Sequence, residues 1–312
     1  IGLVLVNTLQ PGRTVPQEMR TQLEQKYQGD IEQNMEVAEQ AEGRGPLQPL
    51  VDIVPSNFFE SASDNGNMLQ VVFVALFLGV VLLLLPGEKS EPLLAVFDSL
   101  FEAIIKAVEI IMLTAPVGVF GLLADAITSI AAESPADLAS LLGALGFYCL
   151  TVVIGLAIMV FVVYPIFMRL FTSISIPDYF RAIAPAQLVA FSTSSSGGTL
   201  PVTMEVSEKN LGVSEQVSSF VLPLGATVNM DGTALYQAVS AVFIAQVLGI
   251  SLALTQQLNI VLIAVLASIG TAAVPSAGIV MLVVILESTG VPSAGLALIL
   301  GVDRPLGMLR TT

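Results

Sequence analysis

The sequence predicts an all-α, polytopic membrane protein in which several helices are interrupted within the membrane. Three observations support this fold class: an apolar composition, long runs without a charged residue, and breaks containing Gly, Ser or Pro inside those runs. Hydrophobic residues make up 54% of the 312 positions and charged residues only 12%, about half the usual share for a soluble domain. A soluble protein of this length could not bury so much apolar surface, so we expect lipid to cover part of it.

The composition also excludes several kinds of site. The chain has no His, which removes histidine-based metal sites and catalytic triads that use histidine. The only cysteine is Cys149, so no disulfide can form within the chain. The net charge of -14 argues against binding to nucleic acid. The sequence begins at Ile1 inside an apolar run and stops at Thr312 inside an expected helix, so we interpret it as a fragment.

Residues 1–85 are expected to contain the end of one helix, a long external loop and a second spanning helix. The loop is polar and mostly acidic, which is typical of a solvated segment. The second helix is predicted over 68–85 because this run carries no charge, is just long enough to span a bilayer and stops at Pro86 and Gly87.

Residues 88–130 and 138–169 should form the next two membrane helices. In the first, Asp98, Glu102 and Lys106 share one helix face at i, i+4 spacing, a pattern that suits contact with protein rather than with lipid. The second is an uncharged run whose length and composition make it the clearest spanning helix of the chain.

Residues 182–312 differ from the first half because their uncharged runs are interrupted. Non-helical backbone at membrane depth is tolerated only inside protein or along a watery cavity. Broken helices also direct helix N-termini at anions and free carbonyls at cations. The predicted elements are a first hairpin over 182–210, a broken helix over 216–250, a second hairpin over 255–287 and the start of a last helix over 294–312.

The distribution of basic residues supports a re-entrant hairpin at 182–210. If this segment enters the membrane and returns to the same side, the short loops on that side contain basic residues, whereas those on the other side contain none. Such an asymmetry is the positive-inside pattern of membrane proteins. The basic residues on the predicted inner side are Lys89, Arg169, Arg181 and Lys209.

The first break, Ser192–Thr199, is rich in hydroxyl groups. Gly197 and Gly198 would let the backbone turn tightly, and the hydroxyls and N–H groups could then face a substrate. The alternative is a flexible Gly/Ser linker, although apolar runs flank the segment on both sides.

The second break contains a lone charge, Asp231, within the sequence Asn-Met-Asp-Gly-Thr at 229–233. An unpaired carboxylate is costly to bury in a membrane, so a cation or a basic partner is expected. Asn229 adds an amide oxygen, and the carbonyls of an unwound segment would complete a site for a hard cation. The alternative is an Asp at a helix cap near the surface.

The third break, at 270–278, has Thr271, Pro275 and Ser276 at a predicted hairpin tip. The backbone amides left free there could bind a carboxylate, but an ordinary turn between two spanning helices is the alternative.

The last segment places Asp303, Gly307, Arg310 and Thr311 on one helix face. Arg310 could bind a carboxylate through two parallel hydrogen bonds, whereas Arg304 points away from this face. A basic residue at the end of a helix, near the inner membrane interface, is the alternative interpretation of Arg310.

Two of these motifs closely resemble the glutamate transporter family. They are Ser-Ser-Ser-Gly-Gly-Thr-Leu-Pro-Val-Thr-Met at 194–204 and Leu-Pro-Leu-Gly-Ala-Thr-Val-Asn-Met-Asp-Gly-Thr-Ala-Leu-Tyr at 222–236. This is the dicarboxylate/amino acid:cation symporter family, which includes excitatory amino acid transporters and archaeal aspartate transporters. The resemblance runs over the whole chain.

The resemblance implies a homotrimer that works by an elevator mechanism, in which a transport domain carries the site past a fixed scaffold domain. It assigns the helices within 1–85 and 88–130 to the scaffold, the helix at 138–169 to the transport-domain side, and 182–312 to the core of the transport domain. It implies a multi-pass protein of the plasma membrane, in contact with the lipid bilayer, that is not an enzyme.

The resemblance also implies the residues of the site. The substrate contacts would be Ser195, Ser196, Thr233, Val274, Gly278, Arg310 and Thr311. Sodium ions would be held by Gly225, Thr227, Asn229, Met230, Asp231, Ser268, Ile269 and Thr271.

Two residues depart from the family pattern. Members that transport acidic amino acids have an Asp one turn before the substrate arginine, where this chain has Gly307. Since that Asp receives the amino group, the departure favours a plain dicarboxylate. Excitatory members have a Glu implicated in proton carriage where this chain has Gln237, which argues against proton coupling and potassium antiport.

The sequence therefore predicts sodium-coupled symport of a small anionic substrate, either a dicarboxylate or an acidic amino acid. An anion-conducting, channel-like member of the same fold is the alternative, which saturable, sodium-dependent uptake would separate from a transporter. An intramembrane hydrolase with Ser195 or Ser196 as nucleophile is disfavoured because the chain has no His.

Overall fold

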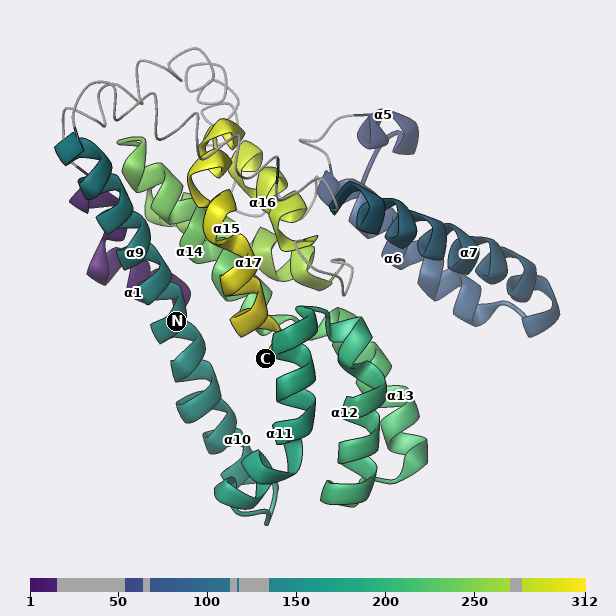
Figure 1. The fold of residues 1–312 in the computed structure, drawn as a ribbon. Coiled ribbons are helices and arrows are strands. Elements are labelled where there is room, and N and C mark those ends of the chain that lie inside the picture. The colour runs from purple at the N-terminus through teal and green to yellow at the C-terminus, as the bar shows by residue number, and fades with distance from the viewer. Residues whose placement is uncertain (16–53, 64–67, 113–116, 118–134, 270–276) are drawn as a thin grey trace.

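The chain is described here by a computed structural model that covers residues 1–15, 54–63, 68–112, 117, 135–269 and 277–312. These residues are mostly helical and contain no strand. Most of the helices pack into one body, whereas α6 (Met68–Leu84) and α7 (Gly87–Met112) extend away from it (Figure 1). The short helix α5 (Phe58–Ala62) contacts α6.

The core of this body surrounds α14 (Asp231–Val247), of which most residues are buried. α1 (Gly2–Leu9), α9 (Pro135–Ile158), α15 (Leu254–Ile269) and α16 (Ala277–Ser288) all pack against it. An apolar helix that is buried on all sides needs other helices rather than lipid as neighbours.

Aromatic and polar contacts hold α9 to α14. The rings of Tyr148 and Phe243 stack with their centroids 4.5 Å apart. The hydroxyls of Tyr148 and Ser240 share a hydrogen bond of 2.7 Å, so both polar groups are satisfied although both residues are fully buried.

The packing of α1 bears on the predicted division into domains. α1 contacts both α9 and α14, and its Val6 is fully buried in the same core. This contact groups the first helix with the helices of the predicted transport domain rather than with a scaffold. Which helices move during transport stays a prediction.

Within the described ranges, one helix, Ala139–Phe171, is long and apolar enough to cross a membrane by length and composition. It corresponds to the run predicted at 138–169, but the sequence analysis did not predict its π-helical segment, Met159–Val163, which precedes α10 (Tyr164–Phe171). Pro165 explains the irregular turn, because its ring nitrogen carries no hydrogen to donate to the preceding turn.

The first predicted hairpin consists of α11 (Ile176–Thr193) and α12 (Ser196–Leu211), which pack along each other. The Nδ2 of Asn210 closes its open end by donating to the carbonyl of Ala182 at 2.9 Å. That the hairpin re-enters a membrane stays a prediction.

The sequence interpretation of the hairpin turn was wrong about the residues that make it. The turn lies at Ser194, whose φ of 54° is left-handed, and at Ser195, whose hydroxyl accepts from the Gly198 N–H at 3.0 Å. Gly197 and Gly198 belong to the first turn of α12. Serine side-chain capping, rather than glycine flexibility, therefore reverses the chain.

A broken helix was predicted over 216–250. α13 (Glu215–Val228) and α14 are separated by Asn229 and Met230, both with non-helical dihedral angles. The second hairpin is described in its two arms, α15 and α16, while the tip predicted at 270–278 lies mostly outside the described residues. α17 (Ala297–Thr311) follows a 3-10 turn at Ser293–Leu296 and continues through Pro305.

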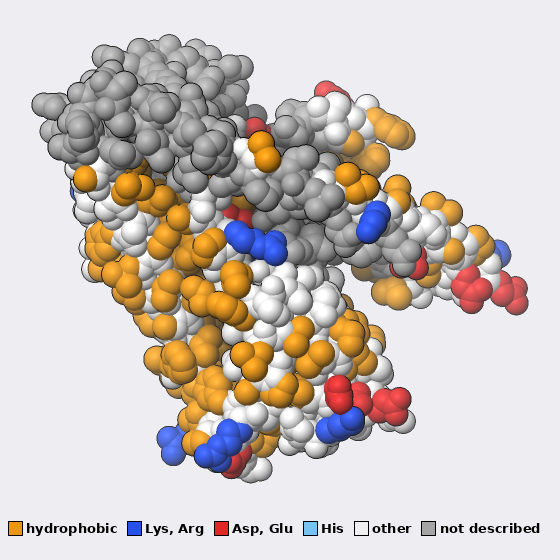
Figure 2. Space-filling view, viewed as in Figure 1, with side chains coloured by type: hydrophobic (Ala, Val, Ile, Leu, Met, Phe, Trp, Pro, Cys, Tyr) orange, Lys and Arg blue, Asp and Glu red, His pale blue; other side chains and the backbone are white. Residues whose placement is uncertain are grey.

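The surface of the main body has an apolar flank and a charged end. Figure 2 shows apolar side chains along the flank and basic side chains gathered at the end where α10, α11 and α12 meet. Arg169, Arg181 and Lys209 lie on these three helices. They are three of the four basic residues of the predicted inner side, and the fourth, Lys89, lies on α7. Which side of the membrane this end faces stays a prediction. The exposed apolar residues of α10 include Ile166, Phe167, Leu170 and Phe171.

Candidate functional site

Arg310 lies on the inner face of α17, where the N-terminal ends of α14 and α16 come close to it. Its guanidinium lies over the ring of Tyr236, with the carbon Cζ 4.8 Å from the ring centroid. A Cβ placed on Gly278 would come within 2.8 Å of the Arg310 Nη1. A Cβ on Gly232 would come within 3.0 Å of the Arg310 carbonyl oxygen. The two glycines therefore leave the room that the arginine occupies.

The residues that the structure describes do not satisfy every donor of the Arg310 guanidinium. Its Nη1 is buried and has no hydrogen-bond partner in the part of the chain that the structure describes. Burying a guanidinium without an anionic partner is unfavourable, and a planar N–H fork of this kind suits a carboxylate. Thr233, which is buried, lies beside Gly278 in the same place. The structure thus brings together three predicted substrate residues: Thr233, Gly278 and Arg310.

Gln237 connects this site to the second hairpin. Its Nε2 donates to the carbonyl of Gly278 at 3.1 Å, and the residue is fully buried. The bond fixes the beginning of α16 against α14. The sequence analysis considered Gln237 only for ion coupling and did not assign a role to Tyr236 or Gly232. Tyr236 and Gly232 lie within the motif at 222–236, and this was the feature of the sequence that could have identified them as site residues.

One cavity has a volume of about 340 Å³, and a second, of about 360 Å³, lies between α11, α12, α13 and α17. The second cavity brings together Ser196 and Thr311 with Gly225 and Asn229, so predicted substrate and sodium residues share one space. Ser196 reaches it because the Ser195 cap starts α12 directly at the cavity. The hydroxyl of Thr311 donates to the carbonyl of Gly307 at 2.8 Å.

Asp231 is the first residue of α14 and is half-buried. One of its carboxylate oxygens, Oδ2, accepts a hydrogen bond of 3.1 Å from the hydroxyl of Tyr164 on α10. A carboxylate in the first helical turn is also favoured by the helix dipole. No group of three or more His, Cys, Asp or Glu occurs among the residues described, so a cation here would depend on Asp231 together with neutral oxygens.

Two other predicted sodium residues form hydrogen bonds within their own helices. The hydroxyl of Thr227 donates to the Leu224 carbonyl at 3.1 Å, and the hydroxyl of Ser268 donates to the Val265 carbonyl at 2.8 Å. Met230 lies in the break itself. Thr271 and Val274 lie outside the described residues, and of Ile269 only the backbone is described.

Comparison with known proteins decides the family. A family model described as "Sodium:dicarboxylate symporter family" matches residues 1–312. The chain belongs to the sodium:dicarboxylate symporter family. The resemblance found from the two motifs is therefore confirmed.

Curated members of the sodium:dicarboxylate symporter family include bacterial and animal transporters. The chain is 36% identical to the "Proton/sodium-glutamate symport protein" of Bacillus subtilis (strain 168), over all of this chain and 68% of that protein. It is equally identical to the "Proton/glutamate-aspartate symporter" of Escherichia coli (strain K12), with the same coverage. It is 41% identical to "Excitatory amino acid transporter 1" of Homo sapiens, over 80% of this chain and 45% of that protein.

Membership in this symporter family implies a membrane protein, as the apolar composition predicted. The names of the relatives include protons as well as sodium among the coupled ions. The exclusion of proton coupling from Gln237 therefore stays a prediction.

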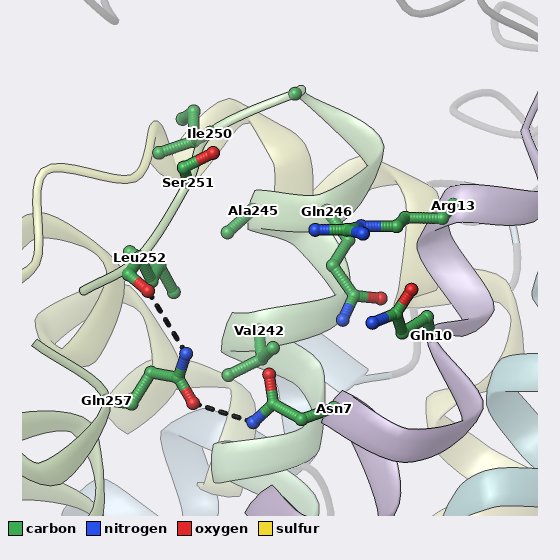
Figure 3. A pocket seen from close by; sticks show the side chains of 11 residues that line it. Asn7, Gln10, Arg13, Val242, Ala245, Gln246, Ile250, Ser251, Leu252 and Gln257 are labelled. Atoms are coloured by element: carbon green, nitrogen blue, oxygen red, sulfur yellow. Dashed lines mark hydrogen bonds between the residues drawn. The ribbon is translucent and has the colours of Figure 1, made fainter. Parts of the chain in front are cut away.

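The cavity of about 340 Å³ lies at the other end of α14, away from Asp231 and Arg310 (Figure 3). Its amide side chains bond mainly to the protein itself. The Nδ2 of Asn7 donates to the Oε1 of Gln257 at 2.6 Å, and the Nε2 of Gln257 donates to the Leu252 carbonyl at 3.1 Å. The bond between Asn7 and Gln257 joins α1 to α15.

Proposed function

We propose that this protein moves a small dicarboxylate or acidic amino acid across the plasma membrane together with sodium ions. The observation that carries the proposal is Arg310, whose buried Nη1 has no hydrogen-bond partner among the described residues. The guanidinium lies over Tyr236 and beside Gly278, which in turn lies beside Thr233. An anion is the partner that would match a buried cationic group in this position. A carboxylate of the substrate would supply both the charge and the hydrogen-bond acceptors.

Sodium is the proposed coupling ion. Asp231 carries the only charge at the break between α13 and α14, and Asn229 and Gly225 lie beside the cavity that leads to Ser196 and Thr311. A cation bound by Asp231 and carbonyl oxygens of the break would stabilise the same geometry that receives the substrate. Because the ion and the substrate would bind to the same arrangement of residues, each would favour the binding of the other, which is the thermodynamic basis of coupling.

The proposed movement is that of an elevator in a homotrimer. α14 is buried on all sides by helices of the main body, so it cannot open to either side of the membrane by itself. Moving the whole body, with its site intact, would preserve these contacts. α6 and α7 extend from the body and make few contacts with it, which suits a separate scaffold.

The test is uptake into proteoliposomes that contain the intact protein. We expect saturable uptake of at least one of aspartate, glutamate, succinate, fumarate and malate, driven by an inward sodium gradient and absent when choline replaces sodium. Anion current without saturable uptake of any of the five would instead favour the channel-like alternative. Uptake that is independent of sodium would contradict the ion assignment.

A further inference from the structure

We propose that Tyr164 is a positioning residue that lowers the affinity of the Asp231 site for sodium. Its hydroxyl holds the Asp231 carboxylate when no ion is bound and has to release it when sodium enters. This inference rests on the proposed role of Asp231 as a sodium ligand.

The contact joins two residues that are 67 positions apart in the sequence. The Tyr164 hydroxyl donates to the Asp231 Oδ2 at 3.1 Å. Hydrogen bonds from a hydroxyl to a carboxylate are commonly about 2.5–2.7 Å long. The contact is therefore long enough to be exchanged for a stronger partner, and Tyr164 is partly exposed.

The π-helical segment determines which way Tyr164 points. It comes immediately before Tyr164, and a π turn holds one residue more than an α turn. One extra residue rotates the helix that follows by about 100° relative to an uninterrupted α-helix. Without this irregularity, the side chain of Tyr164 would leave a different face of α10. The π turn in Ala139–Phe171 thus allows Tyr164 to reach Asp231 at the proposed ion site.

The carboxylate and its predicted partners face different ways in this structure. Asn229 and Gly225 line the cavity between α11, α12, α13 and α17, whereas the Asp231 carboxylate meets α10. To bind one cation together with Asn229, the carboxylate has to turn from Tyr164 towards the break. A bond that exists only in the ion-free state stabilises that state, so its loss should favour sodium binding.

The experiment compares sodium binding by the intact protein and by its Tyr164→Phe variant, using radioactive sodium in a scintillation proximity assay. We expect the dissociation constant for sodium to fall about three- to tenfold in the variant, the fold-change that corresponds to the net contribution of one ordinary hydrogen bond, since this contact is long. General damage to the site would raise this constant instead. An unchanged or raised constant would overturn the proposal.

Tyr148→Phe is the matched control. It also removes one tyrosine hydroxyl, but that hydroxyl bonds to Ser240 and does not contact Asp231. Its sodium affinity should remain that of the wild type, and an equal fall in both variants would overturn the specific role of Tyr164.

Asp231→Asn separates this inference from the function on which it rests. If Asp231→Asn leaves sodium binding unchanged, the proposed ion site itself is wrong. If Asp231→Asn weakens binding strongly while Tyr164→Phe has no effect, the ion site stands and only the role of Tyr164 fails. When both proposals hold, the double variant should bind sodium no more tightly than Asp231→Asn alone.

Discussion

The two ends of α14 differ in how completely the protein satisfies its own polar groups. At the C-terminal end, the amides of Asn7 and Gln257 bond to each other and to the backbone around a cavity of about 340 Å³. At the N-terminal end, the helix is broken, and the buried Nη1 of Arg310 has no partner among the described residues. The cavities at the two ends are of similar size, so cavity volume does not identify the site. What distinguishes the N-terminal end is the buried Arg310 nitrogen without a partner among the described residues, because the charged residue that lines the other cavity, Arg13, is exposed.

The largest effect is expected from Arg310→Ala. Removing the guanidinium takes away the group that would bind the substrate carboxylate, and losing one partner of a buried charge pair typically costs 2–5 kcal/mol. We therefore expect substrate affinity in sodium to fall by about 30-fold or more. Equilibrium binding of each of the five candidate substrates would measure it.

Arg304→Ala is the matched control for this change, because Arg304 is an exposed arginine on the same helix. It should leave substrate affinity unchanged. Equal losses in the two variants would mean that charge on α17 matters in general, and that the unmatched guanidinium of Arg310 does not mark the site.

Asp231→Asn should have the next largest effect. The amide retains the shape of the side chain but removes its charge, so the cation loses its only formal counter-charge at the break. We expect the sodium concentration for half-maximal substrate binding to rise about tenfold or more. A sodium titration of substrate binding measures this, and size-exclusion chromatography should show an unchanged oligomer. Wild-type sodium dependence in this variant would remove Asp231 from the ion site.

Gly278→Ala tests how closely α16 approaches the arginine. The added Cβ would lie 2.8 Å from the Arg310 Nη1, closer than a methyl group and a nitrogen can pack, so the guanidinium has to move. We expect an approximately five- to tenfold loss of substrate affinity, by the usual cost of overpacking a close contact. Gly143→Ala, where a Cβ meets nothing within 4 Å, is the control. Equal affinities in the two variants would show that the close approach has no role in binding.

The sequence predicted the arrangement along the chain better than the local geometry. The helices were predicted from runs without charged residues, because burying a charge in a membrane is costly and such charges are therefore rare. The lone Asp231 indicated the position of the break for the same reason. The sequence could not show that Ser194 adopts a left-handed conformation while Gly197 and Gly198 stay helical. Serine capping and glycine flexibility both explain a Ser-Gly segment, and only the backbone angles decide between them.

The same limit applies to the candidate site. Asp231 could be chosen from the sequence because it is a lone charge in an apolar run, and Arg310 because it shares a helix face with Asp303, Gly307 and Thr311. The contacts between Tyr164 and Asp231 and between Gln237 and Gly278 join residues that are far apart in the chain. Such pairs depend on helix packing and on one π turn, which no local periodicity reveals.

The smallest effect is expected from Gly307→Asp, which tests the choice of substrate. The guanidinium of Arg310 supplies a cationic fork, and Gly307 supplies no acidic group one turn earlier for an amine. A desolvated amino group without an acceptor costs more than about 1 kcal/mol, or several-fold in affinity. We therefore expect succinate or malate to compete at least as well as aspartate in the wild type, and Gly307→Asp to shift the preference several-fold towards aspartate.

The geometry at Gly307 allows this exchange. A Cβ placed there would lie 3.7 Å from the Arg310 Nη2, an ordinary contact, so the new carboxylate can be accommodated beside the guanidinium. Competition binding of aspartate against succinate, in wild type and variant, measures the shift. Asp303, which is buried two turns before Arg310 on the same helix, is the group that could already receive an amine. If the wild type binds aspartate far more tightly than succinate, the argument from Gly307 is wrong, and Asp303→Asn should then reduce aspartate affinity while sparing succinate.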